Sequence, residues 1–298
     1  MSNMANQAVS YFTKELVACP VCNGEFRREE LRTGRGRLIA GKLSAELRRH
    51  YEPSQKYGEI YPLVYSITVC PHCWFAAMAG DFENVPTDAT EALDENREER
   101  GKQMRMLFKD LDFNEPRRVQ EGLASYLLAV YCYEYYHDDF SPTIKQAVCT
   151  LRAAWLCSDL HRKMPDENYD YFRLILYRKA SFLYNLAIQL EQSGKQSIGN
   201  LKHLGPDIDK NYGYDGALYI MGLLEYLYGP REDREQRLNA LIHAKRTVAR
   251  IFGMGRASKN KPAAILDNAR DVYEQINKEI ESLGADPADS AEEADEDV

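Results

Sequence analysis

The sequence predicts an α+β fold that is mainly α, with a small N-terminal zinc ribbon containing β-strands followed by an α-helical hairpin repeat domain. Two Cys-Pro-x-Cys motifs, Cys19–Cys22 and Cys70–Cys73, lie near the start of the chain. The segment Tyr61–Val69 is rich in β-branched and aromatic residues, leads directly into the second motif and is typical of a strand. Beyond Phe82 the strand signals stop, and helical patterns with clear starts and ends follow.

The composition divides the chain into a nearly neutral body and an acidic tail. The 298 residues, 44% hydrophobic and 28% charged, suit a soluble globular protein with a sizeable core. The segment Asp286–Val298 holds seven acidic residues and no base, so most of the formal net charge of -8 belongs to it. We expect a flexible N-terminus at 1–16, a zinc-ribbon-like domain at 17–85 with a basic insertion at 27–60, a charged linking helix at 86–116, a helical repeat domain at 117–284 and an acidic disordered tail at 285–298.

The chain carries no sequence signal for a membrane. No segment has the roughly 20 consecutive apolar residues that a membrane helix needs. The start of the chain lacks the basic and apolar regions of a secretory signal. We therefore expect a cytoplasmic protein, in which cysteine thiols stay reduced.

The two cysteine motifs together predict a metal site. Two Cys-Pro-x-Cys pairs can present four thiolates to one tetrahedral Zn²⁺, and each proline helps to fix its turn. A redox pair is less favoured because thioredoxin-like sites have one motif on a βαβ unit. Catalytic zinc is less favoured because four thiolates leave no open coordination position. We expect one structural zinc ion, with His72 as a solvent-facing spacer and as ligands Cys19, Cys22, Cys70 and Cys73.

The segment between the motifs is basic and suggests an alternative role. From Arg27 to Lys56 it holds nine Lys/Arg and four Asp/Glu, and ribbons with basic loops often meet nucleic acid or another anion. A solvated segment of mixed charge is the more ordinary interpretation. Gly36–Leu43 resembles a phosphate-binding loop but has Leu43 where Ser or Thr would hold Mg²⁺, so we expect a turn followed by a short helix at Lys42–Tyr51. The residues expected to contact an anion are Arg35, Arg37, Lys42, Arg48 and Arg49.

Helix start and stop signals divide the rest of the chain into six segments. Ser141 and Pro142 mark one start, Asp233 and Gln236 resemble a capping box, and Gly284 marks the last end. The predicted helices are Val119–His137, Ser141–His161, Asp166–Gln192, Asp215–Tyr228, Asp233–Phe252 and Pro262–Leu283.

Small residues at regular spacing favour paired helices of the tetratricopeptide type over a generic bundle. In that pattern small residues let two helices pack closely, and Gly222 lies where a first helix often has glycine. The matches are partial, because the full aromatic signature is missing and the period exceeds 34 residues. The residues at the second-helix spacing are Ala147, Leu151 and Ala154, and again Ala180, Tyr184 and Ala187.

The segments CPVCNGEF, RTGRGRL, VCPHCWFAA and GDF resemble the bacterial domain-of-unknown-function family 2225. The resemblance covers roughly residues 17–255 and is specific near the N-terminus. It implies four zinc-ligand cysteines and a tetratricopeptide-like scaffold. It implies no enzymatic activity, because the family has no settled one. Trp74 departs from the glycine or small residue expected at that position.

Two further clusters are candidate sites. Glu134–Asp139 gathers His137 with three acids, but it lies at a helix end, where polar clusters are ordinary loop chemistry. Tyrosines at helical spacing are more often core residues, although they could line a concave peptide groove. These tyrosines are Tyr126, Tyr133, Tyr177, Tyr184, Tyr219 and Tyr226.

The leading hypothesis for function is a non-enzymatic zinc-binding scaffold or adaptor. Its helical repeats would hold a protein partner or peptide segment, and the ribbon would brace one end. The alternative is a nucleic-acid-binding regulatory protein that uses the ribbon and its basic insertion. An enzyme of unrecognised type is the third and least favoured interpretation.

Overall fold

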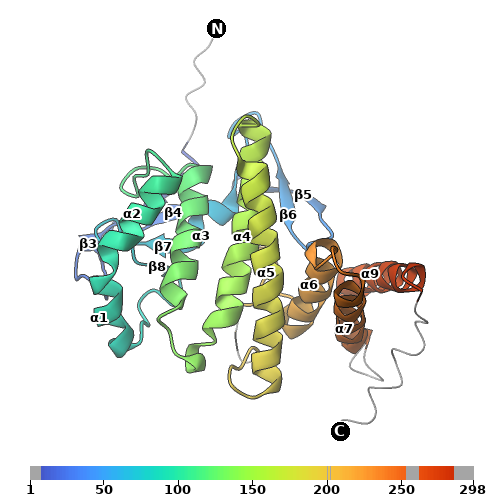
Figure 1. Ribbon diagram of the computed structural model, residues 1–298. Helices are drawn as coiled ribbons and strands as arrows, with labels where there is room; N and C mark the ends of the chain where they lie inside the picture. The colour runs from blue at the N-terminus through green and yellow to red at the C-terminus, as the bar shows by residue number, and fades with distance from the viewer. Residues whose placement is uncertain (1–7, 200, 202, 253–261, 285–298) are drawn as a thin grey trace.

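The structure, a computed structural model, describes residues 8–199, 201, 203–252 and 262–284. Within them, short strands near the N-terminus are followed by a row of helices from α1 (Thr87–Glu95) to α9 (Ala263–Ser282) (Figure 1). The predicted α+β fold with a mainly α chain is confirmed. The predicted acidic tail at 285–298 lies outside the described residues.

The strands form two-stranded antiparallel pairs rather than one continuous sheet. Each pair has few residues, so its stability depends on packing against helices or on a metal. The pairs in the described part of the chain are β1 (Ser10–Phe12) with β4 (Glu29–Leu31), β2 (Val17–Ala18) with β3 (Glu25–Phe26), β5 (Ile39–Leu43) with β6 (Arg49–Glu52), and β7 (Ile67–Val69) with β8 (Ala76–Met78).

Strand β1 lies inside the segment that the sequence predicts to be a flexible N-terminus. Ser10 Oγ donates to Glu29 Oε1 at 2.5 Å, and Tyr11 OH donates to Glu30 Oε2 at 2.6 Å. These two bonds add side-chain anchors to the backbone pairing with β4. The order of this segment therefore comes from a partner strand later in the chain, which local composition does not reveal.

The basic insertion forms a hairpin, so the predicted short helix at Lys42–Tyr51 is wrong. Strands β5 and β6 pair across this segment, and the turn is closed by the Ser44 N–H, which donates to the Arg48 carbonyl at 2.9 Å. Leu47 adopts a left-handed backbone with φ 58 in the turn, a conformation that no helix interior accepts. Gly36 also has a positive φ and precedes a strand, which removes the phosphate-loop geometry that a following helix would supply.

The predicted linking helix at 86–116 is two helices, α1 and α2 (Arg97–Leu107), separated at Asn96. The Asn96 side chain donates to the Ala92 carbonyl at 2.8 Å and helps to end α1. Arg100 on α2 is 1% exposed and donates to the carbonyls of Leu93 and Cys73, both at 2.7 Å. This segment is therefore packed on the N-terminal region rather than extended as a linker.

The remaining helices begin and end close to the predicted positions. The Gln236 N–H donates to Asp233 Oδ1 at 2.8 Å, as one half of a capping box requires. Ser141 differs from the prediction: its backbone is left-handed and its hydroxyl donates to the Ser197 carbonyl instead of capping the helix. These helices are α3 (Val119–Tyr133), α4 (Pro142–Lys163), α5 (Tyr169–Gln192), α6 (Gly213–Tyr228) and α7 (Arg234–Phe252).

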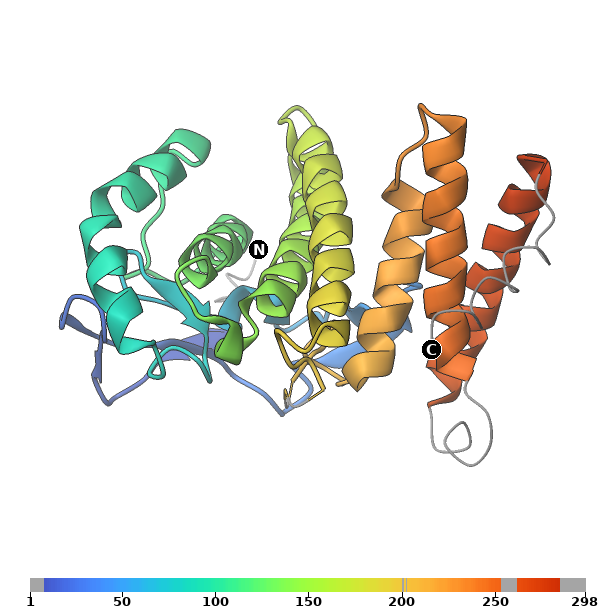
Figure 2. The same cartoon turned by 60° about the horizontal axis from the view of Figure 1, so that its bottom comes forward.

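Consecutive helices pack side by side, α4 with α5 and α6 with α7 (Figure 2). Gly222 on α6 allows the close approach, because a Cβ there would lie 2.2 Å from Val248 Cγ2 on α7. Gly122 on α3 does the same toward the N-terminal region, since its Cβ would lie 2.8 Å from Val64 Cγ2 in η1 (Pro62–Tyr65). One hydrophobic core therefore extends from the cysteine motifs to α9.

No helix among the described residues combines the length and apolar character needed to cross a membrane.

Candidate metal centre

The first cysteine motif folds into a tight turn held by its own backbone. The Cys19 N–H donates to the Gly24 carbonyl at 3.0 Å, and the Asn23 N–H donates to the Cys19 carbonyl at 2.9 Å. Asn23 adopts a left-handed backbone with φ 59, which asparagine tolerates better than most residues. The turn places Cys19 and Cys22 on the same side of the chain, near the end of β2.

The second motif repeats this geometry between β7 and β8. The Cys70 N–H donates to the Phe75 carbonyl at 2.8 Å, and the Trp74 N–H donates to the Cys70 carbonyl at 2.9 Å. Trp74 occupies the left-handed position with φ 61, where the family resemblance led us to expect a small residue. Its ring contacts Phe113 edge-on with centroids 5.6 Å apart, so side-chain packing offsets the backbone strain.

The two turns bring four sulfur atoms together. Cys19 Sγ lies 3.6 Å from Cys73 Sγ, and Cys22 Sγ lies 3.7 Å from Cys70 Sγ. All four sulfurs lie within 4.8 Å of one another. A tetrahedral site with metal–sulfur bonds of about 2.3 Å requires sulfur separations of about 3.8 Å. The residues present therefore fit a four-thiolate metal ion, as the sequence predicts.

The protonation of these cysteines reflects their crowding. Hydrogen bonds from Cys70 and Cys73 lower the pKa of Cys19 to about 2. The same contact with Cys19 raises the pKa of Cys70 to about 12, and the pKa of Cys73 is raised in the same direction. These contacts therefore favour the Cys19 thiolate and oppose ionisation of Cys70 and Cys73. Metal binding would have to displace the remaining protons, so the affinity is expected to fall in acid.

Three of the four cysteines are buried, and Cys22 is half-buried. Cys19 and Cys70 have no exposed surface, and Cys73 is 1% exposed. The ring of Phe82 packs on Phe26 and on Phe75, with centroids 5.7 and 4.9 Å apart. Phe26 and Phe75 follow the two motifs and Phe82 ends the Gly-Asp-Phe segment, so these three segments meet in one small core.

His72 lies outside the four-cysteine cluster. Its Nε2 is 3.1 Å from the Glu25 carbonyl of β3, so the ring joins the two turns. A Cβ on Gly24 would lie 2.5 Å from the His72 ring, which explains a glycine in the first turn. The geometry agrees with a spacer at the second turn rather than a ligand.

The other three cysteines, Cys132, Cys149 and Cys157, are fully buried in α3 and α4. Burial raises the pKa of Cys132 to about 11 and that of Cys149 and Cys157 to about 12. They are protonated side chains of the core, as their helical positions predict.

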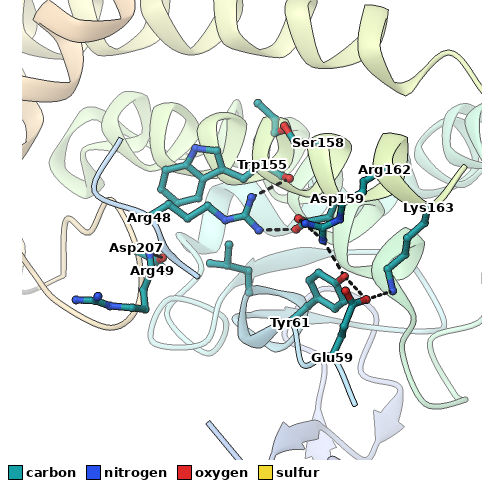
Figure 3. A network of polar contacts seen from close by, with 12 residues as sticks. Arg48, Arg49, Glu59, Tyr61, Trp155, Ser158, Asp159, Arg162, Lys163 and Asp207 are labelled. Atoms are coloured by element: carbon teal, nitrogen blue, oxygen red, sulfur yellow. Dashed lines mark hydrogen bonds and ion pairs between the residues drawn. The ribbon is translucent and has the colours of Figure 1, made fainter. Parts of the chain in front are cut away.

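The five basic residues expected to contact an anion differ in their exposure to solvent. Arg35 and Lys42 are exposed and Arg37 is half-buried, all on the hairpin segment. Arg48 is 8% exposed: it forms an ion pair with Asp159 and donates to the Trp155 carbonyl at 3.1 Å (Figure 3). A nucleic acid cannot reach Arg48 in this arrangement.

Arg49 is also engaged with the rest of the chain. Its Nε lies 3.0 Å from Asp209 Oδ2, and its backbone N–H donates to Asp207 Oδ2 at 2.7 Å. Its Nη1 donates to the Gly41 carbonyl at 2.8 Å across the hairpin. Arg49 therefore fastens the hairpin to the loop between α5 and α6.

The tip of the hairpin is bound in a groove of the helices. Glu46 accepts hydrogen bonds from the Trp155 indole on α4 and from the Tyr177 hydroxyl on α5, the latter at 2.9 Å. The Tyr219 hydroxyl on α6 donates to the Ala45 carbonyl at 2.7 Å. Burial raises the pKa of Glu46. The hairpin tip therefore occupies a tyrosine-lined groove that the sequence pattern suggested for a partner peptide.

Five tyrosines of the proposed face belong to the core, and the sixth, Tyr226, is half-buried against it. Tyr126, Tyr133, Tyr184 and Tyr219 are at most 1% exposed, and Tyr177 is 5% exposed. The sequence pattern did not predict that the hairpin tip binds to Tyr177 and Tyr219. These contacts join residues more than 100 positions apart. One feature of the sequence could have indicated this contact. Trp155 and Tyr177 lie in apolar helices, and a buried indole N–H or phenol O–H needs a hydrogen-bond partner.

The Glu134–Asp139 cluster serves as loop structure. His137 pairs with Asp88 of α1, and Asp138 Oδ1 accepts a hydrogen bond from Gln196 at 2.7 Å. Among the described residues, the four cysteines form a group able to hold a metal ion, and this cluster does not.

Comparison with known proteins extends the resemblance seen in the sequence. A family model described as "Uncharacterized protein conserved in bacteria (DUF2225)" matches residues 12–276. An uncharacterized protein of Borreliella burgdorferi is 45% identical over 275 residues, which cover 92% of this chain and 99% of that protein. No solved structure matches the chain.

Proposed function

Because the chain belongs to the bacterial domain-of-unknown-function family 2225, we propose a function from the site and surface alone: a non-enzymatic scaffold. A metal-bound N-terminal region braces a row of helices, and the helices hold a segment of a protein partner. The proposed metal is one structural zinc ion at Cys19, Cys22, Cys70 and Cys73. The proposed compartment is the cytoplasm, where the thiols stay reduced.

The donor set supports a structural metal rather than a catalytic one. Four sulfur ligands complete the tetrahedral coordination that zinc adopts in structural sites. A catalytic zinc keeps one position for water or substrate, and four thiolates leave none. Cys19, Cys70 and Cys73 are also nearly completely buried, as the ligands of a structural site commonly are, whereas Cys22 is half-buried.

The observation that carries the scaffold proposal is a groove of about 890 Å³ between α5 and the turn joining α6 to α7. Phe182 in its wall is 63% exposed, Leu174 is 37% exposed and Leu227 is 38% exposed. Large apolar side chains gathered in one groove are typical of a protein interaction site. Unlike the groove filled by the hairpin tip, this one keeps its apolar wall open to solvent.

The chemistry of the groove favours an amphipathic helix as partner. Leu174, Arg178 and Phe182 recur every four residues and share one face of α5. Arg178 places a positive charge between the two apolar side chains, whereas Glu225 opposite is already bound by Ser181 and Asn185. The expected partner helix therefore presents apolar residues at i and i+7 and an acidic residue between them.

We expect Phe182→Asp to abolish partner capture. Affinity purification from the native cell with quantitative mass spectrometry should recover a partner on the wild-type protein and at least tenfold less on Phe182→Asp. Met106→Asp is the matched control, because Met106 is also exposed, at 78%, but lies on α2 away from the groove. Equal recovery on all three proteins would refute the scaffold assignment of this groove.

A second candidate function, binding of single-stranded nucleic acid, is favoured by one specific surface. A hollow of about 400 Å³ is lined by Tyr11, Arg32, Arg35 and Arg37 among others. The Arg32 guanidinium lies over the Tyr11 ring at 5.0 Å, and that of Arg37 lies over Tyr57 at 4.7 Å. Single-strand binders without sequence preference hold phosphates with basic side chains and stack bases on aromatic rings, and here the exposed ring is Tyr11, since Tyr57 is buried.

If this second function holds, Arg35→Asn/Arg37→Gln should weaken binding of a single-stranded oligonucleotide. The slope of log affinity against log salt should fall by about 0.7 for each phosphate that the variant no longer neutralises. Asparagine at position 35 keeps the left-handed backbone, for which φ is 52. The control Arg97→Gln/Lys102→Gln removes two exposed charges from α2 and should leave the slope unchanged. Equal slopes in both double variants would exclude this surface.

A further inference from the structure

The hollow beside Tyr11, of about 400 Å³, is lined by three arginines and, among the described residues, by no acid. Its size falls within the roughly 300–1,000 Å³ that is usual for small-molecule sites. It is formed by β1, the end of β4 and the loop that leads to β5. An anion is therefore the class of ligand that this wall attracts. The lining residues are Tyr11, Leu31, Arg32, Thr33, Arg35 and Arg37.

The arginines of the hollow keep hydrogen-bond donors available for a ligand. Within the described part of the chain, none of Arg32, Arg35 and Arg37 forms an ion pair. Arg32 donates from Nε to the Ser10 carbonyl at 3.1 Å, which leaves both of its terminal nitrogens. Arg37 donates from Nη1 to the Gly34 carbonyl at 3.4 Å. Its Nε is buried, so Nη2 is the nitrogen that a ligand can reach.

The two carboxylates of β4 are matched by arginines outside the hollow. Glu30 lies 3.4 Å from Arg28 Nε and accepts from the Tyr11 hydroxyl at 2.6 Å. Glu29 is nearly buried and lies 3.8 Å from Arg117 Nε. These two acids are therefore paired with two other bases. The three arginines that line the hollow receive no counter-charge from β4.

The loop of the hollow holds Arg35 in an uncommon backbone conformation. Gly34, Arg35 and Gly36 all have left-handed φ, with values of 81, 52 and 70. The Arg37 N–H closes the turn by donating to the Gly34 carbonyl at 3.2 Å. Such a conformation is rare in residues other than glycine, and rare conformations gather at ligand-binding loops. The Arg35 side chain is exposed and makes no hydrogen bond with the described residues, so all of its donors can meet a ligand.

We propose that this hollow binds a phosphate monoester, with the phosphate against the three arginines and the organic group against Tyr11, which is 39% exposed. A guanidinium fork matches the oxygens of a phosphate and donates two parallel N–H bonds. A phosphate monoester carries about 1.5–2 negative charges at pH 7, whereas each phosphodiester inside a strand carries one. Three unmatched positive charges in one hollow therefore favour the monoester. The proposal rests on the second candidate function, whose surface it uses, and it names the class of phosphate bound there.

Phenyl phosphate is a suitable probe, because its ring can lie against Tyr11 while its phosphate meets the arginines. Isothermal titration calorimetry with the whole chain should show saturable binding at a single site. Methyl phenyl phosphate is the matched control, since it is a diester of nearly the same size with a single negative charge. It should bind at least tenfold more weakly.

Two substitutions separate a site from general electrostatics. Arg35→Asn should weaken the binding of phenyl phosphate about tenfold, because asparagine keeps the left-handed backbone and removes one guanidinium. Arg27→Asn should leave it unchanged, since Arg27 is also exposed and lies in the same basic segment but outside the hollow. Circular dichroism checks that both variants remain folded. No saturable binding of phenyl phosphate, equal affinity for the diester, or equal weakening by the two variants would overturn the proposal.

Two single-stranded oligonucleotides distinguish the sources of the phosphate. If a strand that ends in a phosphate binds at least tenfold more tightly than the same strand ending in a hydroxyl, the ligand is a strand end. If phenyl phosphate binds and the two strands bind equally or not at all, the ligand is a free phosphate ester. If the two strands bind equally and phenyl phosphate does not bind, the single-strand function stands and the monoester site is refuted.

Discussion

Replacing Cys70 with serine is expected to abolish metal binding and to unfold the N-terminal region. Elemental analysis should find about one zinc per wild-type chain and far less in the variant. Apparent binding free energies of structural zinc are about 10–16 kcal/mol in small modules, whereas a whole domain is stable by about 5–15 kcal/mol. The two-residue strand pair β2–β3 has no comparable source of stability, whereas β7–β8 also packs against α3.

The unfolding should extend into α3 and fade toward α9. The Tyr133 hydroxyl of α3 accepts from the Met78 N–H of β8 at 3.0 Å and donates to Asp81 at 2.6 Å. Arg117, just before α3, donates to the Ile67 carbonyl of β7 at 2.7 Å. Hydrogen exchange should therefore show reduced protection in α3 and retained protection in α6 and α7. Because one hydrophobic core joins the cysteine motifs to the helices, the effect of metal loss is not confined to the N-terminal strands.

Cys157→Ser is the control for this experiment. It makes the same atomic change at another fully buried cysteine, which lies on α4 outside the four-sulfur cluster. We expect it to keep one zinc per chain and a cooperative unfolding transition. A wild-type protein that folds without metal, or a Cys70→Ser protein that retains it, would contradict the assignment.

The metal cluster could be predicted from the sequence because its information is local. Each motif needs only a few residues to form its turn, and proline restricts that turn before any tertiary contact exists. The long helices were predictable for a related reason: apolar spacing and start and stop residues act within one or two turns. The grouping of the four cysteines and the positions of α3 to α7 and α9 therefore followed from short windows.

The hairpin could not be predicted in this way. Lys42–Tyr51 contains alanine, leucine, glutamate and arginine, which favour a helix in isolation. In the structure the Glu46 carboxylate accepts hydrogen bonds from the Trp155 indole and the Tyr177 hydroxyl. These tertiary contacts outweigh the helical preference of the segment. Its partners lie more than 100 residues later, so no window of the sequence contains both sides. The burial of Arg48 could not be predicted for the same reason, because its partners Trp155 and Asp159 also lie more than 100 residues later.

Removing the carboxylate of Asp159 should loosen the hairpin, which keeps its contacts through Glu46 and Arg49, and should cause the largest decrease in stability outside the metal site. Asp159→Leu leaves the nearly buried Arg48 guanidinium without its main partner, which typically costs about 3–5 kcal/mol. Arg48→Met should cost less, because Asp159 keeps its contact with Arg162. The double variant Arg48→Met/Asp159→Leu should be more stable than Asp159→Leu alone, since it leaves no unpaired buried charge. Denaturant unfolding measures all three free energies.

An exposed ion pair of the same kind supplies the control. Arg270 and Asp267 on α9 lie 3.1 Å apart with side chains 61% and 68% exposed, so Asp267→Leu should cost less than about 1 kcal/mol. Exchange of the Leu47 amide should accelerate in Asp159→Leu and not in Asp267→Leu, because the hairpin tip is released from its anchor only in the first. If the two aspartate variants were equally stable, the ion pair would not hold the hairpin.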